Sequence, residues 1–312
     1  MVKIFRAIVS IVPMVAVIAL SCTSCGISQY TNIDDVLSCK NGWYKTLSSD
    51  FSKGTMPDKW AIRGDHEARD CGGETFYWDN DEVSFPPSTD HLKINYEQKA
   101  SELNTTGCIE TKTTETDPGF NQAFGYWEVD CKLLQEQYGW SAFWLQCNGE
   151  SQVGNGGRDG SEIDILESLY YIEPKNTVRI TTHCDGYDDT PIFGHHKEFY
   201  KIASYTDSGN QPISFYDGNY HKFGLLWTPE RYYMYVDRHL VMETDGGGVV
   251  GICQVPVYAI LSGHMGPGGN NFGYENIKFS DYTEPGEFDI RSFNCYQNSH
   301  FEKYIRQTSD FS

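Results

Sequence analysis

Short runs in which apolar and polar residues alternate occupy residues 43–283, and clusters of Gly, Pro, Asn and Asp separate them. Alternation with a period of two puts successive side chains on opposite faces of a half-buried strand. Only His300 to Arg306 has a spacing compatible with two helical turns. With no internal repeat or low-complexity linker, the pattern predicts one all-β sandwich. The clearest expected strands are Leu92 to Glu97, Tyr126 to Leu133, Ala142 to Cys147, Val178 to His183, Phe223 to Trp227, Tyr232 to Asp237 and Val257 to Ser262.

One run departs from strict alternation. Between Glu162 and Glu167, carboxylates are threaded between aliphatic residues, and a regular strand would put Glu162 and Asp164 on one face. Glu167 would then share the isoleucine face, where an unpaired charge is costly to bury. A β-bulge near Ile165 and Leu166 removes this conflict, because one extra residue turns Glu167 toward the other two acids. The sequence therefore predicts three carboxyl groups in a row on one face of a sheet.

Such a row suits the cleavage of glycosidic bonds with retention of configuration. That reaction needs two carboxyl groups roughly 5–5.5 Å apart, one as nucleophile and one as general acid/base. Glu162 and Glu167 could supply the pair, and Asp164 between them would help to set their charge states apart. The alternative interpretation is an acidic strand whose charges only keep a sheet edge soluble.

The segment from Glu162 to Glu167 resembles the signature of glycoside hydrolase family sixteen, in the bulged form of laminarinases and several galactan hydrolases. Three further stretches are similar to family segments in the same order, and the resemblance covers about residues 43–283. Ser141 stands where the family usually has proline, which we expect to loosen the turn before Trp144. The three stretches are Gly125 to Val129 with Lys132, Gly139 to Leu145, and His221 to Asp237.

The resemblance implies an all-β, concanavalin-like jelly roll of two curved antiparallel sheets, with a sugar cleft on the concave sheet. It implies an endo-glycosidase acting on β-1,3-glucan or mixed β-1,3/1,4-glucan by double displacement. Glu162 would be the nucleophile, Glu167 the acid/base, and Asp164 would orient and tune Glu162. Catalysis would need no cofactor. The family often carries a structural calcium ion on the convex side, for which the sequence identifies no ligands.

Three other activities remain open at this stage. A hydrolase of red-algal-type galactan would have the same catalytic residues in a different cleft. A lectin-like protein would bind glucan without cutting it, although it would have no reason to keep both Glu162 and Glu167. A transglycosylase would transfer the sugar to a second sugar in place of water.

Aromatic side chains are expected in a sugar cleft, because sugar rings present apolar C–H faces that stack on indole and phenol rings. Alternation from Ser141 to Cys147 puts Trp144 in the cleft and Phe143 in the core. Trp140 is a second candidate platform. His183 resembles the family histidine on the leaving-group side of the substrate, and Trp227 resembles a core tryptophan.

The net charge of the protein limits the classes of molecule that it can bind. The sequence of 312 residues has 24 basic and 43 acidic residues, for a formal net charge of −19. Nucleic acids bind to basic surfaces that release counterions, so we exclude them as partners. The same repulsion disfavours strongly sulfated polysaccharides and leaves a neutral glucan unaffected. We expect a monomer whose partner is a polysaccharide. His195 and His196 lack further ligands at metal-binding spacing.

The two ends of the chain are expected to be segments separate from the hydrolase-like domain, the C-terminal one a tail packed on the sandwich. Met1 to Ser21 resembles an export signal, with Lys3 and Arg6 before an apolar run. Cys22 could carry a lipid, so we expect a protein that is secreted or anchored at the cell surface, with a membrane contact only through that lipid. Residues 1–28 are therefore left out of the fold. Residues 284–312 extend beyond the resemblance, and we assign them no function.

Eight cysteines remain after the first 28 residues, and an exported chain could join them in up to four disulfides. A cysteine on a buried strand could instead serve as a small apolar residue. Their spacing is too wide for a zinc ribbon. The eight are Cys39, Cys71, Cys108, Cys131, Cys147, Cys184, Cys253 and Cys295.

Overall fold

The structure, a computed structural model, describes residues 30–38, 41–71, 74–87, 89–100, 103–112, 119–136, 138–147, 155–168, 175–185, 197–207, 210–265 and 285–311. The expected export signal, Cys22 and the pair His195 and His196 lie outside these residues. None of the helices within the described part has the length and apolar character that crossing a bilayer requires.

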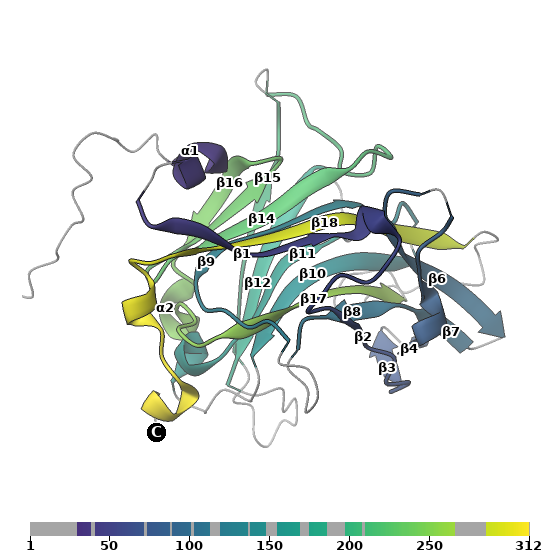
Figure 1. Cartoon of the computed structure of the whole chain (residues 1–312), viewed down its shortest axis with the longest axis horizontal. Helices are drawn as coiled ribbons and strands as arrows, with labels where there is room; N and C mark the ends of the chain where they lie inside the picture. The colour runs from purple at the N-terminus through teal and green to yellow at the C-terminus, as the bar shows by residue number, and fades with distance from the viewer. Residues whose placement is uncertain are drawn as a thin grey trace, which may run out of the picture.

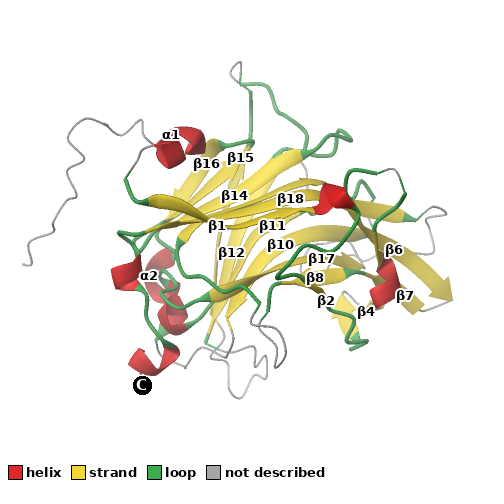
Figure 2. Cartoon of the chain, viewed as in Figure 1, coloured by secondary structure: helices red, strands yellow, loops and turns green. Residues whose placement is uncertain are grey.

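Two sheets packed face to face form the domain (Figures 1 and 2), which confirms the predicted all-β jelly roll. The first sheet has eleven strands and runs in the order β16-β15-β14-β9-β18-β6-β7-β4-β3, with β1 beside β18 and β5 beside β6. All its pairs are antiparallel except β4 with β7. Its strands are β1 (Trp43–Asp50), β3 (Arg69–Cys71), β4 (Glu74–Trp78), β5 (Val83–Ser84), β6 (Leu92–Ala100), β7 (Leu103–Thr106), β9 (Gly125–Lys132), β14 (His221–Trp227), β15 (Tyr232–Val236), β16 (His239–Thr244) and β18 (Gly286–Asn298).

The second sheet has seven strands in the order β13-β12-β11-β10-β17-β8-β2, all antiparallel. It contains the acidic run at its centre. Its strands are β2 (Ala61–Ile62), β8 (Cys108–Glu110), β10 (Gly139–Cys147), β11 (Glu162–Glu167), β12 (Thr177–Cys184), β13 (Lys197–Ser204) and β17 (Val257–Met265). All seven runs expected to be strands are strands.

Within the described residues, helical structure is confined to short segments. Residues 300–306, the expected helix, contain only a single 3₁₀ turn. The α-helices among the described residues are α1 (Ile33–Ser38) and α2 (Gly247–Val250), and the 3₁₀ turns are η2 (Phe51–Lys53), η3 (Asn80–Glu82), η4 (Gly156–Asp159), η7 (Glu302–Tyr304) and η8 (Thr308–Phe311).

Alternate side chains of the two sheets meet in one apolar layer. Phe143 and Leu145 of β10 enter it from the second sheet, and Trp127 of β9 enters it from the first. Trp227 is fully buried, and its indole N–H donates to the Cys253 carbonyl at 3.0 Å. The structure thus confirms that Phe143 and Trp227 are core residues, as period-two alternation requires.

Four of the cysteines expected in disulfides are free thiols in this apolar layer. Cys108, Cys131, Cys253 and Cys295 are each 0% exposed. Burial raises the pKa of each thiol, so all four remain protonated at neutral pH. The disulfide prediction is therefore wrong for these four, because their side chains point between the sheets and pack as small apolar groups. Cys39 and the side chain of Cys71 lie outside the described residues.

The C-terminal part of the chain is a central strand of the sandwich. We expected residues 284–312 to form an extension packed on the sandwich, whereas β18 pairs with β9, β6 and β1 within the first sheet. Figure 1 shows β18, near the C-terminus, running beside β1 from the other end of the chain. Phe293 of β18 packs in the core against Trp60, Trp127 and Phe143. The alternation that buries it is the same period-two signal found in the rest of the domain.

Because Phe293 fills the layer between the sheets, Phe293→Ala should lower the free energy of unfolding by about 3–5 kcal/mol. Ser292→Ala is the matched control on the same strand, and a partly exposed serine should change this energy by less than about 0.5 kcal/mol. Urea denaturation followed by tryptophan fluorescence measures both. Equal stability of the two variants would show that β18 does not contribute to the core.

Candidate active site

A one-residue bulge in β11 brings the three acids of the central strand to one face. Against β10, Glu167 pairs with Ala142 and Asp164 pairs with Trp144, and the register shifts between them. Ile165 is the extra residue, which places the bulge where the sequence predicts it. Ile163, Ile165 and Leu166 pack in the core. Glu162, Asp164 and Glu167 line one hollow on the opposite face, together with Trp140, Ala142, Trp144 and His264.

A pair of serines fixes the end of the bulged strand. The backbone N–H of Ser168 donates to the Ser141 carbonyl at 2.9 Å, and the backbone N–H of Ser141 donates to the Ser168 hydroxyl at 2.7 Å. The Ser141 hydroxyl also accepts from the backbone N–H of Leu134 at 3.1 Å. A proline at this position would have no N–H for Ser168. Ser141 therefore ties β10 to β11 beside Glu167, which corrects the expectation that it loosens this segment.

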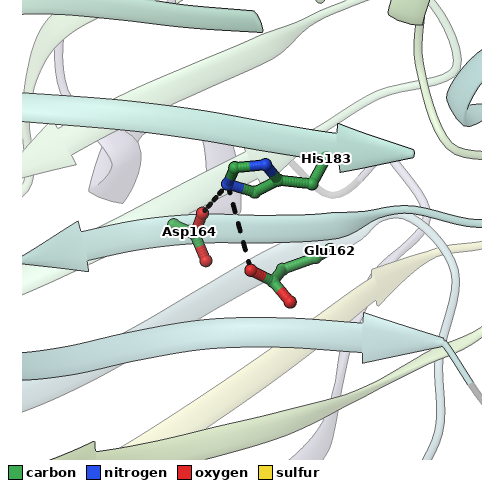
Figure 3. A group of neighbouring side chains, drawn as sticks. All are labelled: Glu162, Asp164 and His183. Atoms are coloured by element: carbon green, nitrogen blue, oxygen red, sulfur yellow. Dashed lines mark ion pairs between the residues drawn. The ribbon is translucent and has the colours of Figure 1, made fainter. Parts of the chain in front are cut away.

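The neighbouring strands hold Glu162 and Asp164. Gln146 of β10 donates from Nε2 to Oε2 of Glu162 at 2.9 Å. From β12, His183 Nε2 lies 3.3 Å from Oδ2 of Asp164 and 4.0 Å from Oε1 of Glu162. Figure 3 shows the imidazole reaching from its strand to both carboxyl groups on β11. Its place follows from the register, because His183 pairs with Glu162.

Burial changes the proton affinities of two of these acids. Burial and then the charge of Glu167 raise the pKa of Asp164 well above its ordinary value. Burial also raises the pKa of Glu167, although the positive charge of Arg179, followed by smaller contributions that include a hydrogen bond with Thr181, counteracts it. A hydrogen bond with Glu162 lowers the pKa of Asp164, but its effect is smaller than that of burial. Because burial has the largest effect, the pKa of Asp164 stays above its ordinary value.

Trp144, Ser262 and His264 form a hydrogen-bonded wall beside the acids. The Trp144 indole N–H donates to the Ser262 hydroxyl at 3.0 Å, and that hydroxyl lies 3.1 Å from Nε2 of His264. Burial lowers the pKa of His264 to about 3, so its ring is neutral, and a hydrogen bond joins its Nε2 to the Ser262 hydroxyl. The imidazole also stacks on Trp140, with ring centroids 4.9 Å apart and an angle of 12° between the planes.

The part of the chain that the structure describes contains one group of donors close enough to share a metal ion. Glu162, Asp164 and His183 place their ligand atoms within 4.8 Å of one another. This group does not fit the calcium ion expected on the convex side, because it lies in the hollow and offers an imidazole nitrogen. Ca²⁺ prefers six to eight oxygen ligands. The structural calcium therefore stays a prediction.

Every site residue named from the sequence contributes to this hollow or to its edge. Glu162, Asp164, Glu167, Trp144 and Trp140 line it, and His183 contacts two of its acids. Trp140 is only 7% exposed, so its ring offers little surface to a ligand. The sequence did not indicate the roles of three polar residues around the hollow, namely Gln146, Ser262 and Thr181. Alternation along the strand of Trp144 could have indicated Gln146. No local pattern indicated Ser262 or Thr181.

The chain is similar to known proteins in both sequence and fold. It is 28% identical over 130 residues to endo-1,3-1,4-beta-glycanase EglC of Rhizobium meliloti (strain 1021), a segment that spans 42% of this chain and only 23% of that relative. A Bacteroides ovatus family 16 endo-glucanase, solved with the ligand G4G3G-2F-DNP, has 20% identity and a TM-score of 0.59, and the match covers 80% of this chain and 99% of that one.

The laminarinase (endo-1,3-beta-glucanase) catalytic domain of Thermotoga petrophila RKU-1 also has 20% identity, with a TM-score of 0.57, over 83% of this chain and 99% of that one. At such identities the solved structures show a common fold. A family model described as glycosyl hydrolases family 16 matches residues 73–266, which include the bulged strand and the strands that line the hollow. The chain therefore belongs to glycosyl hydrolase family 16.

Proposed function

We propose that this protein is a retaining endo-glycosidase that cleaves β-1,3-glucan or mixed β-1,3/1,4-glucan by double displacement. The observation that carries the proposal is the bulge at Ile165, which directs Glu162, Asp164 and Glu167 into one hollow. The similarity to a 1,3-1,4-glycanase favours the β-glucan substrate. The acidic net charge agrees with a neutral polymer.

Glu162 and Glu167 have different roles in the proposed reaction. Glu162 is the carboxylate that attacks the anomeric carbon, and its hydrogen bond with Asp164 orients it. Burial raises the pKa of Glu167 and so favours its protonated form, which gives its proton to the departing sugar oxygen as the glycosidic bond breaks. In the second step Glu167 takes a proton from water, the water oxygen bonds to the anomeric carbon, and the ester to Glu162 breaks. Two inversions at this carbon restore the β configuration.

The remaining side chains of the hollow position the sugar and the nucleophile. Gln146 orients Glu162 through its hydrogen bond, and His183 holds the side of Asp164 that faces β12. Trp144 offers a partly exposed indole to the C–H face of a sugar ring, and the wall of Ser262 and His264 fixes the plane of this indole. No step in this scheme uses a cofactor.

The proposal extends to the cellular location. The leader-like segment before Cys22 supports export, followed by release or by a lipid anchor at the cell surface. A polysaccharide too large to enter a cell is degraded outside it, which agrees with that location. We propose that the exported protein acts as a monomer.

A product analysis on three polymers tests the substrate. The protein should release short oligosaccharides from laminarin or from the mixed-linkage glucan lichenan, and none from agarose, because the proposed cleft is specific for β-glucan. Chromatography of the products over time measures size, and proton NMR of the first products should show the β anomer. Cleavage of agarose alone would replace the glucanase with a galactan hydrolase, and binding without cleavage would indicate a lectin.

Azide distinguishes the roles of the two glutamates. On an aryl β-glucoside of several glucose units, Glu162→Ala should lose activity by several orders of magnitude, and azide should restore turnover as an α-glycosyl azide. Glu167→Ala should lose about 10²–10⁴-fold on the polymer and should give a β-glycosyl azide, because azide replaces water in the second step. Glu243→Ala, an exposed glutamate of the first sheet, is the control. Identical azide products from both variants would contradict these roles.

Thr181→Val should change the pH dependence of kcat/KM. The hydrogen bond with Thr181 favours the charged form of Glu167 and lowers its pKa, so removing it should raise this pKa. Glu167 would then keep its proton to higher pH, and the alkaline limb of the profile should move to higher pH. Thr182→Val is the control, because the Thr182 hydroxyl bonds to the Phe199 carbonyl. A shift to lower pH, or an equal shift in both variants, would refute Glu167 as the acid.

A further inference from the structure

The second sheet carries an exposed apolar strip on its edge strand β13, two strands away from the acids on β11. Few large apolar side chains of the described residues are exposed, and two of them are neighbours on β13. Tyr200 is 55% exposed and Ile202 is 52% exposed. Exposed apolar groups that lie together on one face of a sheet often mark a binding surface.

The strand register places this strip on the same face as the acids. Tyr200 pairs with Thr181 of β12, and Ile202 pairs with Arg179. Side chains directly opposite each other in an antiparallel pair share a face. Thr181 and Arg179 act on Glu167 from the cleft side, whereas the intervening Ile180 packs in the core. Tyr200 and Ile202 therefore continue the floor of the cleft outward from β11 through β12.

An arginine holds the tyrosine ring against the sheet. The Arg179 guanidinium lies 4.6 Å from the centroid of the Tyr200 ring, as in a cation–π contact. Its nitrogen atoms also donate to Glu198 at 3.2 Å and to Thr181 at 2.9 Å. The arginine charge is thus balanced within the protein, and the strip offers an apolar surface without an unbalanced charge for an anionic group.

This surface matches the apolar face of a neutral sugar. Pyranose rings present C–H faces that stack on phenol rings and contact branched aliphatic groups. Adjacent strands are about 4.8 Å apart, so β13 lies about 10 Å from the acids on β11. A chain of a few sugar units bound across the strands covers this distance. The strip also continues from the hollow in which the proposed reaction takes place.

We propose that Tyr200 and Ile202 form a subsite for sugar units of a β-glucan chain, on the leaving-group side of the cleaved bond. This inference rests on the proposed glucanase function. In this placement Trp144 of β10 contacts the sugar that Glu162 attacks, and β13 lies on the opposite side of β11, toward the departing sugar. The consequence is a preference for long chains, since only a polymer or long oligosaccharide reaches from the acids to β13.

Two substrates test the subsite. One is the β-glucan polymer that the wild type cleaves best, and the other is an aryl β-oligoglucoside whose small aryl leaving group cannot reach β13. Tyr200→Ala should lower kcat/KM on the polymer about threefold to tenfold and leave the aryl substrate unchanged. Tyr200→Phe should keep wild-type activity on both, because the ring remains. Tyr44→Ala, which removes a 46% exposed tyrosine of the first sheet, is the matched control.

The outcomes separate this inference from the proposed function. Equal losses on the two substrates would show that Tyr200 supports the catalytic residues or the fold, and would overturn the subsite. No loss on either substrate would overturn it as well. If the wild type cleaved neither substrate, the glucanase proposal itself would fail, and the subsite would fail with it. Loss limited to the polymer, with rescue by phenylalanine, supports the subsite.

Discussion

The extra residue at Ile165 reconciles two requirements of β11 that strict alternation could not satisfy together. The aliphatic residues of this strand must pack between the sheets, and Glu167 must avoid that layer. Burying an unpaired carboxylate costs several kcal/mol, whereas a bulge interrupts one rung of a strand ladder at a cost of about 1 kcal/mol. The bulge is therefore the smaller cost. It also places Glu167 in the hollow with Glu162 and Asp164, so the packing of the core and the geometry of the site have the same physical cause.

Burial in the hollow also raises the pKa of two of its acids. Asp164 and Glu167 are less hydrated than ordinary acids, and their proximity makes two charges on them unfavourable. Arg179 and Thr181, which approach from β12, limit this effect for Glu167. In the proposed reaction, the raised pKa of Glu167 favours the protonated form that donates to the departing oxygen. The adjacent strand therefore matters to the chemistry even where it does not touch the reacting atoms.

The first sheet stabilises the site from behind. Phe293 of β18 contacts Phe143 of β10, and the neighbours of Phe143 on that strand, Ala142 and Trp144, line the hollow. Because protein cores are close-packed, a displacement of β18 would be felt across the layer at the cleft. Residues near the C-terminus therefore pack in the same core as the strands that line the hollow, although the family match ends at residue 266.

The sequence by itself determined the strands with the clearest alternation, that Trp144 and Phe143 face opposite ways, and that β11 must contain a bulge, because these depend on local periodicity and on the cost of burying charge. Only the tertiary structure decided what surrounds the acids. Ser262 reaches Trp144 across 118 positions of sequence, β18 enters the centre of the first sheet, and four cysteines point between the sheets instead of toward one another. Such contacts depend on strand order and register between distant segments, which local patterns do not specify.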